Sequence, residues 1–168
     1  MRLTIPDPAL VLLIGPAGSG KSTFARAHFR PVEIVSSDAL RQLISNDPAD
    51  QGASAEAFRI LSLLVSGRLK RRLLTVVDAT SLRAVNRTRY RALAAHRGIP
   101  VVAIAFDLNA STYHSRNRGR AARVVEADVI DWQIELMKRA LVALPGEGYA
   151  ALYVIGDGDA AVELVRSS

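Results

Sequence analysis

Blocks of apolar and polar residues alternate along the chain and predict strands and helices in turn. Short apolar runs rich in β-branched residues predict five buried strands, at residues 11–14, 32–35, 73–77, 101–106 and 151–155. Apolar residues at helical spacing predict helices between and after them, at residues 22–29, 38–44, 55–72, 82–97, 110–118, 126–144 and 160–166. Residues 36–38 and Ser81 are the expected N-caps of the second and fourth of these helices.

Strands that are apolar on both faces must be covered on both sides, which is typical of parallel sheets. The pattern therefore predicts an α/β fold in which helices flank both faces of a parallel five-stranded sheet. Residues 45–53 are rich in turn formers and predict a loop. The 168 residues are enough for one domain with a sizeable core, and no linker or repeat divides residues 1–168.

The composition of the chain restricts the cellular compartment in which we expect the protein. The chain has no cysteine, which excludes disulfides and thiolate metal sites and fits a reducing compartment, so we expect a cytoplasmic protein. No apolar run approaches membrane-spanning length, and the first residues lack the pattern of a signal peptide. We therefore expect no membrane partner.

Positive charge is concentrated in the middle of the chain. Residues 81–123 contain nine arginines, no lysine and a single acid, Asp107. Guanidinium groups suit phosphate oxygens, and such a region can attract a polyanion. The alternative is that about half of these arginines only solvate helix faces.

A phosphate-binding loop lies between the first predicted strand and helix. Residues 15–22, GPAGSGKS, match the pattern G-x-x-x-x-G-K-[ST] in the setting that this pattern requires. Glycines let backbone N–H groups turn inward around phosphates, the lysine adds a charge, and the serine hydroxyl can bind Mg²⁺. The sequence therefore predicts an ATP or other NTP site with Mg²⁺. Its expected nucleotide-binding residues are Gly15, Gly18, Ser19, Gly20, Lys21, Ser22 and Thr23, with Ser22 as the metal ligand.

Two aspartates follow the next two predicted strands, at the edge of the sheet where ligands of this fold class bind. Asp38 lies three residues before Arg41, so on a helix the pair shares a face and can hold an acceptor hydroxyl and an acceptor anion. We assign Asp38 as the general base. Asp78 can reach Mg²⁺ through water. The alternatives are that Asp38 caps a helix and that Asp78 is a strand-end hydrogen-bonding residue.

Three arginines at spacings of four and three residues, Arg116, Arg120 and Arg123, predict an arginine-rich lid at about residues 110–125. If the helix continues through Gly119, they line one face and can close on the γ-phosphate, with Gly119 as a hinge. The alternative is a basic surface helix. The periodicity around Trp132 favours helix packing over a base-stacking role.

The succession of these motifs resembles the kinase domain of the bacterial polynucleotide kinase-phosphatases that repair broken RNA. It comprises GPAGSGKSTFARAHF, then VSSDALRQLISND followed by Gln51, then LTVVDATS followed by Arg87, then RNRGRAARVV. The resemblance covers nearly the whole chain. It implies an adenylate-kinase-like P-loop enzyme that phosphorylates 5′-OH ends of RNA or DNA.

By this resemblance each motif has a role. Lys21 and Ser22 match the nucleotide loop, Asp38 the general base and Arg41 the acceptor-side arginine, while Asp78 and Thr80 match a DAT motif. Arg116, Arg120 and Arg123 match the lid. The catalytic set is then Lys21, Asp38, Arg41 and Arg116, and Arg41, Gln51 and Arg87 are the expected substrate-binding residues.

The chain departs from the family in one respect. Family members usually continue into a phosphatase and often a ligase domain, and this sequence supplies no metallophosphatase histidine and aspartate set. We therefore expect either a stand-alone kinase or the kinase module of a larger repair protein, whose phosphatase or ligase domains would then be its partners. Two alternatives remain open: a kinase for a small metabolite such as gluconate, shikimate or adenylylsulfate, and a non-catalytic NTP-binding domain.

Overall fold

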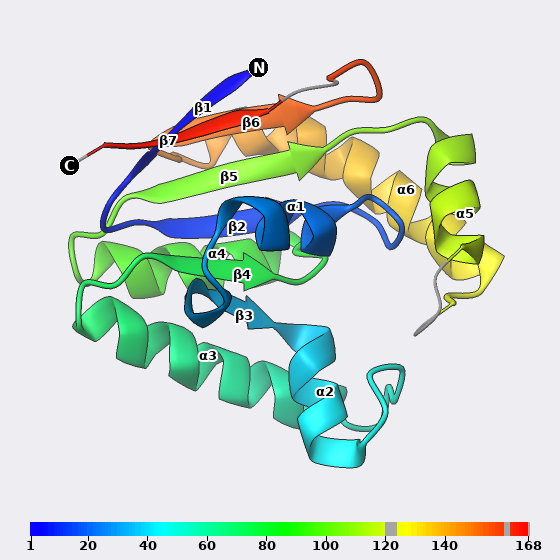
Figure 1. Cartoon of the computed structure of the whole chain (residues 1–168), viewed down its shortest axis with the longest axis horizontal. Helices are drawn as coiled ribbons and strands as arrows, with labels where there is room; N and C mark the ends of the chain where they lie inside the picture. Colours follow the sequence, from blue (N-terminus) through cyan, green and yellow to red (C-terminus); the bar gives the residue numbers. More distant parts are fainter. Residues whose placement is uncertain (120–123, 160–161, 168) are drawn as a thin grey trace.

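A central parallel sheet organises the molecule. The computed structural model describes residues 1–119, 124–159 and 162–167. Five strands form the sheet in the order β3-β4-β2-β5-β6, and every neighbouring pair is parallel. Their bounds are Leu10–Ile14 for β2, Ile34–Ser36 for β3, Thr75–Asp78 for β4, Val101–Phe106 for β5 and Ala151–Ile155 for β6. The predicted α/β P-loop fold with a five-stranded parallel sheet is confirmed (Figure 1).

Six α-helices connect or follow these strands within the described residues. They are α1 (Lys21–His28), α2 (Ser37–Ser45), α3 (Ser54–Lys70), α4 (Ala84–Ala95), α5 (Ala110–Arg118) and α6 (Ala127–Ala143). Two 3₁₀ turns, η1 (Pro31–Glu33) and η2 (Leu144–Gly146), precede β3 and follow α6. None of the helices that the structure describes combines the length and apolarity needed to cross a bilayer.

Alternate residues of the central strands enter two cores. Leu10, Leu12 and Ile14 of β2 pack in one core with residues of α3, α4 and α6. Val11 and Leu13 pack in the other with Phe24 of α1, on the face where α1 is drawn in Figure 1. Because neighbouring side chains of a strand point to opposite faces, continuous apolar runs appear where both faces are covered.

A second, two-stranded sheet corrects the prediction for the C-terminal residues. Residues 160–166 were expected to form a helix, but β7 (Glu163–Ser167) is a strand that pairs in parallel with β1 (Arg2–Pro6). Residues 160–161 lie outside the described residues. Long-range pairing with the first residues of the chain determines this structure, and the local pattern carries no sign of it. Leu3 and Ile5 of β1 are fully buried against the α1 side of the central sheet.

Two smaller corrections concern helix and strand starts. The strand expected at residues 32–35 begins at Ile34, because Pro31 starts the 3₁₀ turn η1 instead. Ser81 does not cap α4, which begins at Ala84 with Arg83 as its N-cap. Ser81 has a positive φ of 49° and is buried in the turn after β4.

The end of α5 bears on the predicted lid. Helix α5 has the predicted bounds and ends at Arg118 with Gly119 as its C-cap, so the condition that the helix continues through Gly119 is not met. Of the three arginines expected in the lid, Arg116 lies in the last turn of α5. Arg120 and Arg123 lie outside the described residues.

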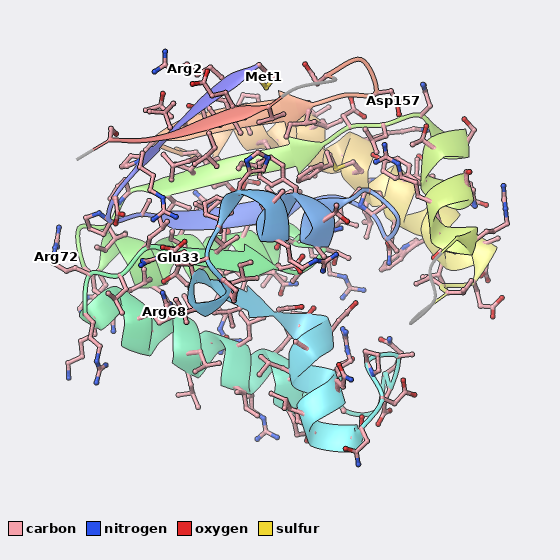
Figure 2. All side chains as sticks on the ribbon, in the orientation of Figure 1. Met1, Arg2, Glu33, Arg68, Arg72 and Asp157 are labelled. Carbon is pink, nitrogen blue, oxygen red and sulfur yellow. The ribbon has the colours of Figure 1, made fainter. Side chains whose placement is uncertain are left out.

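An ion pair between buried Glu33 and partly exposed Arg166 joins β7 to the turn before β3. The Glu33 side chain is fully buried and accepts hydrogen bonds from both terminal nitrogens of Arg166, at 2.9 and 2.7 Å. Arg30 also donates to it, from its backbone N–H at 2.9 Å and from Nε at 2.8 Å. Arg68 of α3 lies near Glu33 (Figure 2), and the negative charge of Glu33 favours the protonated form of Arg68. Burial would raise the pKa of Glu33, but these bonds outweigh it and lower the pKa to about 2.

Candidate nucleotide and acceptor site

A cleft of about 1610 Å³ lies at the carboxyl end of the sheet. Its walls come from the loop before α1, from α1, α2 and the loop before α3, from the end of β4, and from α4, α5 and α6. This is the edge at which open parallel sheets bind ligands. Of the expected site residues, the cleft is lined by Gly18, Ser19, Gly20, Lys21, Ser22, Thr23, Asp38, Arg41, Gln51, Asp78, Thr80 and Arg116.

The glycine loop has a shape that only glycine permits at two positions. Gly18 and Gly20 have φ angles of 80° and 91°, in the left-handed region. A Cβ at Gly18 would overlap the Tyr113 carbonyl of α5, so the loop is packed directly against that helix. Gly20 is the N-cap of α1, and no side chain caps this end. The first N–H groups of α1 therefore face the cleft, where an anion is their natural acceptor.

Lys21 is held inside the loop. Its ammonium group donates to the carbonyls of Gly15 and Pro16, each at 2.8 Å, and to the Ser19 hydroxyl at 3.0 Å. The residue is buried, with an exposed fraction of 8%. Gly15 directly follows β2, and its N–H donates to the Thr80 carbonyl at 3.0 Å. The charge of Lys21 is thus fixed between the sheet and the cleft.

Ser22 and Asp78 meet across the ends of α1 and β4. The Asp78 side chain is buried and hydrogen-bonds the Ser22 side chain. Burial raises the pKa of Asp78, while the Ser22 bond and the charge of Lys21 oppose that rise, and the nearby charge of Asp38 adds to it. A hydroxyl and a carboxylate side by side at a phosphate loop fit a magnesium ion that keeps several waters.

Asp38 and Arg41 form an ion pair on the wall contributed by α2. Arg41 Nη1 donates to Asp38 Oδ1, and Arg41 Nε donates to the Ser54 hydroxyl at 3.0 Å. Arg41 is 5% exposed, and its guanidinium lies 6.0 Å from the centre of the Phe58 ring. Ser36 caps α2 by accepting from the Ala39 N–H at 3.4 Å, so the alternative that Asp38 is the cap is wrong.

Gln51 and Arg116 line the cleft on different elements, the loop before α3 and helix α5. Gln51 lies in the loop before α3, where its side chain is exposed in the cleft and hydrogen-bonds Ala49 and Ser54. Arg116 of α5 reaches over the glycine loop, where its Nη1 contacts the Ser19 carbonyl at 3.4 Å. That atom lies 3.3 Å from the position of a Cβ at Gly20. One arginine thus stands at the phosphate loop, and the other, Arg41, stands on the α2 wall.

Arg87 is outside the cleft, in contrast to the expected substrate-binding role. It is 1% exposed and forms a two-pronged ion pair with Glu147, at 2.9 Å from Nε and 2.5 Å from Nη2. Its Nη1 donates to the carbonyls of Ser81 and Leu82. Arg87 therefore joins α4 to the segment after α6. Among the described arginines of the arginine-rich segment 81–123, those that line the cleft are Arg83 and Arg116.

Three cleft residues escaped the sequence-based prediction. Trp132 of α6 lines the cleft and is 49% exposed, so its expected packing role is wrong. Arg83 lies over its ring, with Cζ 5.4 Å from the ring centre. Gln133 accepts a hydrogen bond from the Ala17 N–H at 2.7 Å and so holds the glycine loop. The buried positions of α6, Ile130, Gln133, Met137 and Ala140, follow a helical stripe that leaves Trp132 out.

The chemistry of this donor set fits a triphosphate with Mg²⁺. The left-handed glycines, the uncapped N-terminus of α1 and Lys21 suit phosphate oxygens. Among the described residues, no cluster of three or more His, Cys, Asp or Glu side chains could hold a metal ion by itself. A metal here would depend on Ser22, phosphate oxygens and water, as magnesium does in nucleotide sites.

Comparisons with known proteins agree with this geometry. A family model described as "AAA domain" matches residues 10–144. No curated protein sequence matches the chain. A chain of the Pnkp1/Rnl/Hen1 RNA repair complex superposes with a TM-score of 0.70 at 21% identity, over 82% of this chain and 46% of that chain.

Kinases of small metabolites have the same fold. A gluconokinase from Sinorhizobium meliloti superposes with a TM-score of 0.57 at 18% identity, over 92% of this chain and 85% of that one. The APS kinase CysC of Mycobacterium tuberculosis gives a TM-score of 0.54 at 20% identity, over 92% and 91% of the two chains. At such low identities the likeness shows a shared fold only.

Proposed function

From the premise that the chain belongs to the AAA domain family and has a P-loop kinase fold, we propose that it is a polynucleotide 5′-hydroxyl kinase. It transfers the γ-phosphate of ATP or another NTP to the 5′-OH end of RNA or DNA, in nucleic-acid repair. The observation that carries the proposal is the Asp38–Arg41 pair, which lies in the same cleft as the phosphate loop. A protein that only binds nucleotide needs no such acceptor-side acid.

Six residues of the cleft have a role in this reaction: Lys21, Ser22, Asp38, Arg41, Asp78 and Arg116. The loop amides, Lys21 and Arg116 hold the phosphates and offset the negative charge that develops during transfer. Asp38 orients the acceptor hydroxyl and takes its proton as the new oxygen–phosphorus bond forms and the bond to the leaving diphosphate breaks. Arg41, fixed by Asp38 and Ser54, faces a neighbouring phosphate of the acceptor. Magnesium, held by Ser22 with Asp78 beside it, would neutralise phosphate charge.

Charge in the cleft supports a polyanionic acceptor. Its described lining includes five basic side chains, Lys21, Arg26, Arg41, Arg83 and Arg116, against the acids Asp38 and Asp78. A strand of nucleic acid carries one phosphate per nucleotide and benefits from several of these groups. The superposition on a chain from an RNA repair complex agrees with this substrate class. Further domains or proteins of a repair complex are the partners we propose.

A small-metabolite kinase is the second candidate, because gluconate and adenylylsulfate kinases share the fold. The two candidates differ in their response to salt. Phosphorylation of an oligonucleotide should weaken steeply as salt rises, since binding releases counterions. Phosphorylation of a small sugar acid should depend on salt only weakly.

The test is a transfer assay with γ-labelled ATP and Mg²⁺. A 5′-OH oligonucleotide, gluconate, shikimate and adenylylsulfate are offered to the chain separately. We expect label on the oligonucleotide, with a KM that rises with salt, and none on an oligonucleotide that already carries a 5′-phosphate. Label on a small metabolite alone would replace the proposal by the second candidate, and ATP binding without transfer to any acceptor would indicate a non-catalytic domain.

A further inference from the structure

Trp132 and Arg83 form an exposed aromatic–cation pair in the cleft. Trp132 is the only tryptophan of the chain, and half of its surface is exposed although it stands on an amphipathic helix. Its ring lies under the guanidinium of Arg83, the N-cap residue of α4. Both side chains line the cleft. An indole ring that is half exposed in a cleft gains free energy when a ligand covers it, so Trp132 is available for stacking.

The pair lines the same cleft as Lys21, Asp38 and Asp78. Gln133, the next residue on α6, holds the glycine loop through the Ala17 N–H at 2.7 Å. Arg83 follows Asp78 by five residues, so the Cα atoms of the two lie within about 17 Å of each other. Leu136, one turn after Trp132, and Asn86, in the first turn of α4, also line the cleft. The wall thus has an apolar strip from α6 beside polar groups from α4.

This surface suits a flat ring with a polar edge. Nucleobases stack on indole rings and on guanidinium planes, and Asn86 can reach the edge of a stacked base. We propose that Trp132 and Arg83 bind the terminal nucleobase of the acceptor strand and thereby position its 5′-OH. The inference rests on the proposed function and makes it more specific, because it requires an acceptor that carries a base on its reacting nucleoside.

A base-dependent assay tests the proposal directly. Two 5′-OH oligonucleotides are compared that differ only in the first residue, which is a normal nucleotide in one and an abasic residue in the other. The wild-type chain should show a KM roughly ten-fold or more higher for the abasic strand, as the loss of one base–aromatic stack predicts. Trp132→Ala should raise the KM of the normal strand to the same level and abolish the difference, with the KM of ATP unchanged.

Matched variants separate stacking from folding. Trp132→Phe keeps an aromatic face and should retain most of the base preference, and Arg83→Ala should reduce it. Two control variants on the same helices, Val142→Ala and Arg89→Ala, concern exposed residues outside the cleft and should behave as wild type. Melting curves check that each variant is folded. Because Trp132 is the only tryptophan, quenching of its fluorescence by the normal strand and not by the abasic strand gives an independent measure of stacking.

The outcomes distinguish the two proposals. If oligonucleotides are phosphorylated but Trp132→Ala and Arg83→Ala keep the wild-type base preference, the stacking inference is wrong and the kinase function stands. If Trp132→Ala raises only the KM of ATP, the pair binds the donor and the inference is also wrong. If no oligonucleotide is phosphorylated by the wild-type chain, the proposed function fails and this inference fails with it.

Discussion

The side chains of Ser22 and Asp78 are hydrogen-bonded to each other across the junction of α1 and β4. The contact places a buried carboxyl group directly beside the hydroxyl that follows the lysine of the phosphate loop. Burial disfavours the charged form of this carboxyl, whereas a bound cation favours it. The position of Asp78 is thus unfavourable for the fold alone and suited to a metal-dependent reaction.

Because burial penalises the charge of Asp78, we can predict the effect of Asp78→Asn on stability and on activity. The folded-state pKa of Asp78 lies above its usual value of 3.8, so the folded state binds more protons and stability falls as the pH rises through the raised pKa. At neutral pH the substitution removes a charge that burial penalises, while asparagine can keep the bond to Ser22. We expect a more stable but less active protein, with a gain of about 1 kcal/mol corresponding to roughly 2–4 °C in Tm.

Melting temperature and transfer rate, measured together at neutral pH, check this expectation. Glu163→Gln is the matched control, because it removes one negative charge from an exposed position on β7. Its Tm and activity should stay at the wild-type values. A Tm for Asp78→Asn below that of wild type would contradict the argument, since it would show that the charged form stabilises the fold.

Asp38→Asn should separate binding from transfer. Asparagine can still accept the hydrogen bond from Arg41, so the α2 wall should keep its shape. The variant lacks a group that takes the proton, and kcat should fall by about 10²–10⁴-fold. The NTP dissociation constant, measured by calorimetry, should not change. Glu56→Gln on exposed α3 surface is the control, and full activity of Asp38→Asn would remove Asp38 from the reaction.

Arg116→Ala should weaken the reaction on the nucleotide side. Its guanidinium lies at the Ser19 carbonyl and beside Gly20, where the phosphates of a nucleotide would lie. Loss of one such donor should lower kcat by roughly 10²-fold or more and raise the KM of the NTP. Arg118→Ala removes an exposed arginine from the same turn of α5, outside the cleft. Equal effects of the two substitutions would indicate a general charge effect instead of a specific contact.

Much of this site was predictable because its signals are local. The glycine loop depends on residues that are neighbours in the chain, and the spacing of Asp38 and Arg41 places them on one helix face before any tertiary contact is known. The convergence of Asp38 and Asp78 followed from the rule that the carboxyl ends of parallel strands meet at one edge. The central strands were also predictable from local signals, because each is a short run of apolar residues.

The failures come from long-range contacts. The pairing of β7 with β1 joins the two ends of the chain, and no local pattern reports it. Arg87 belongs to a block that looks available for phosphate, yet Glu147 binds it from a distant segment and buries it. The exposed ring of Trp132 lies under Arg83, the N-cap residue of α4. In each case a partner far along the chain decides what the residue does.

The Glu33–Arg166 pair predicts how the fold responds to acid. The folded-state pKa of Glu33, about 2, lies below its usual value of 4.5. The charged form is thus favoured in the folded protein, and this stabilisation is present above pH 4.5. It is lost as the pH falls from about 4.5 to about 2. A shift of this size corresponds to about 3–4 kcal/mol at most.

Glu33→Gln should therefore weaken the fold at neutral pH and flatten its acid dependence, because glutamine does not titrate. The substitution also removes the countercharge that Arg166 and Arg30 share, but both arginine side chains are partly exposed and Arg166 keeps its ion pair with Asp7 at 3.6 Å. The loss at neutral pH should therefore not exceed the about 3–4 kcal/mol that corresponds to the pKa shift. Urea unfolding at neutral and acidic pH measures both effects.

Glu56→Gln, which breaks the exposed pair with Arg59, is the control, and it should change the free energy of unfolding by less than about 1 kcal/mol. Wild type and Glu33→Gln could instead lose stability in parallel as the pH falls. The acid response would then arise from other groups, and the link between β7 and the turn before β3 would not depend on the charge of Glu33.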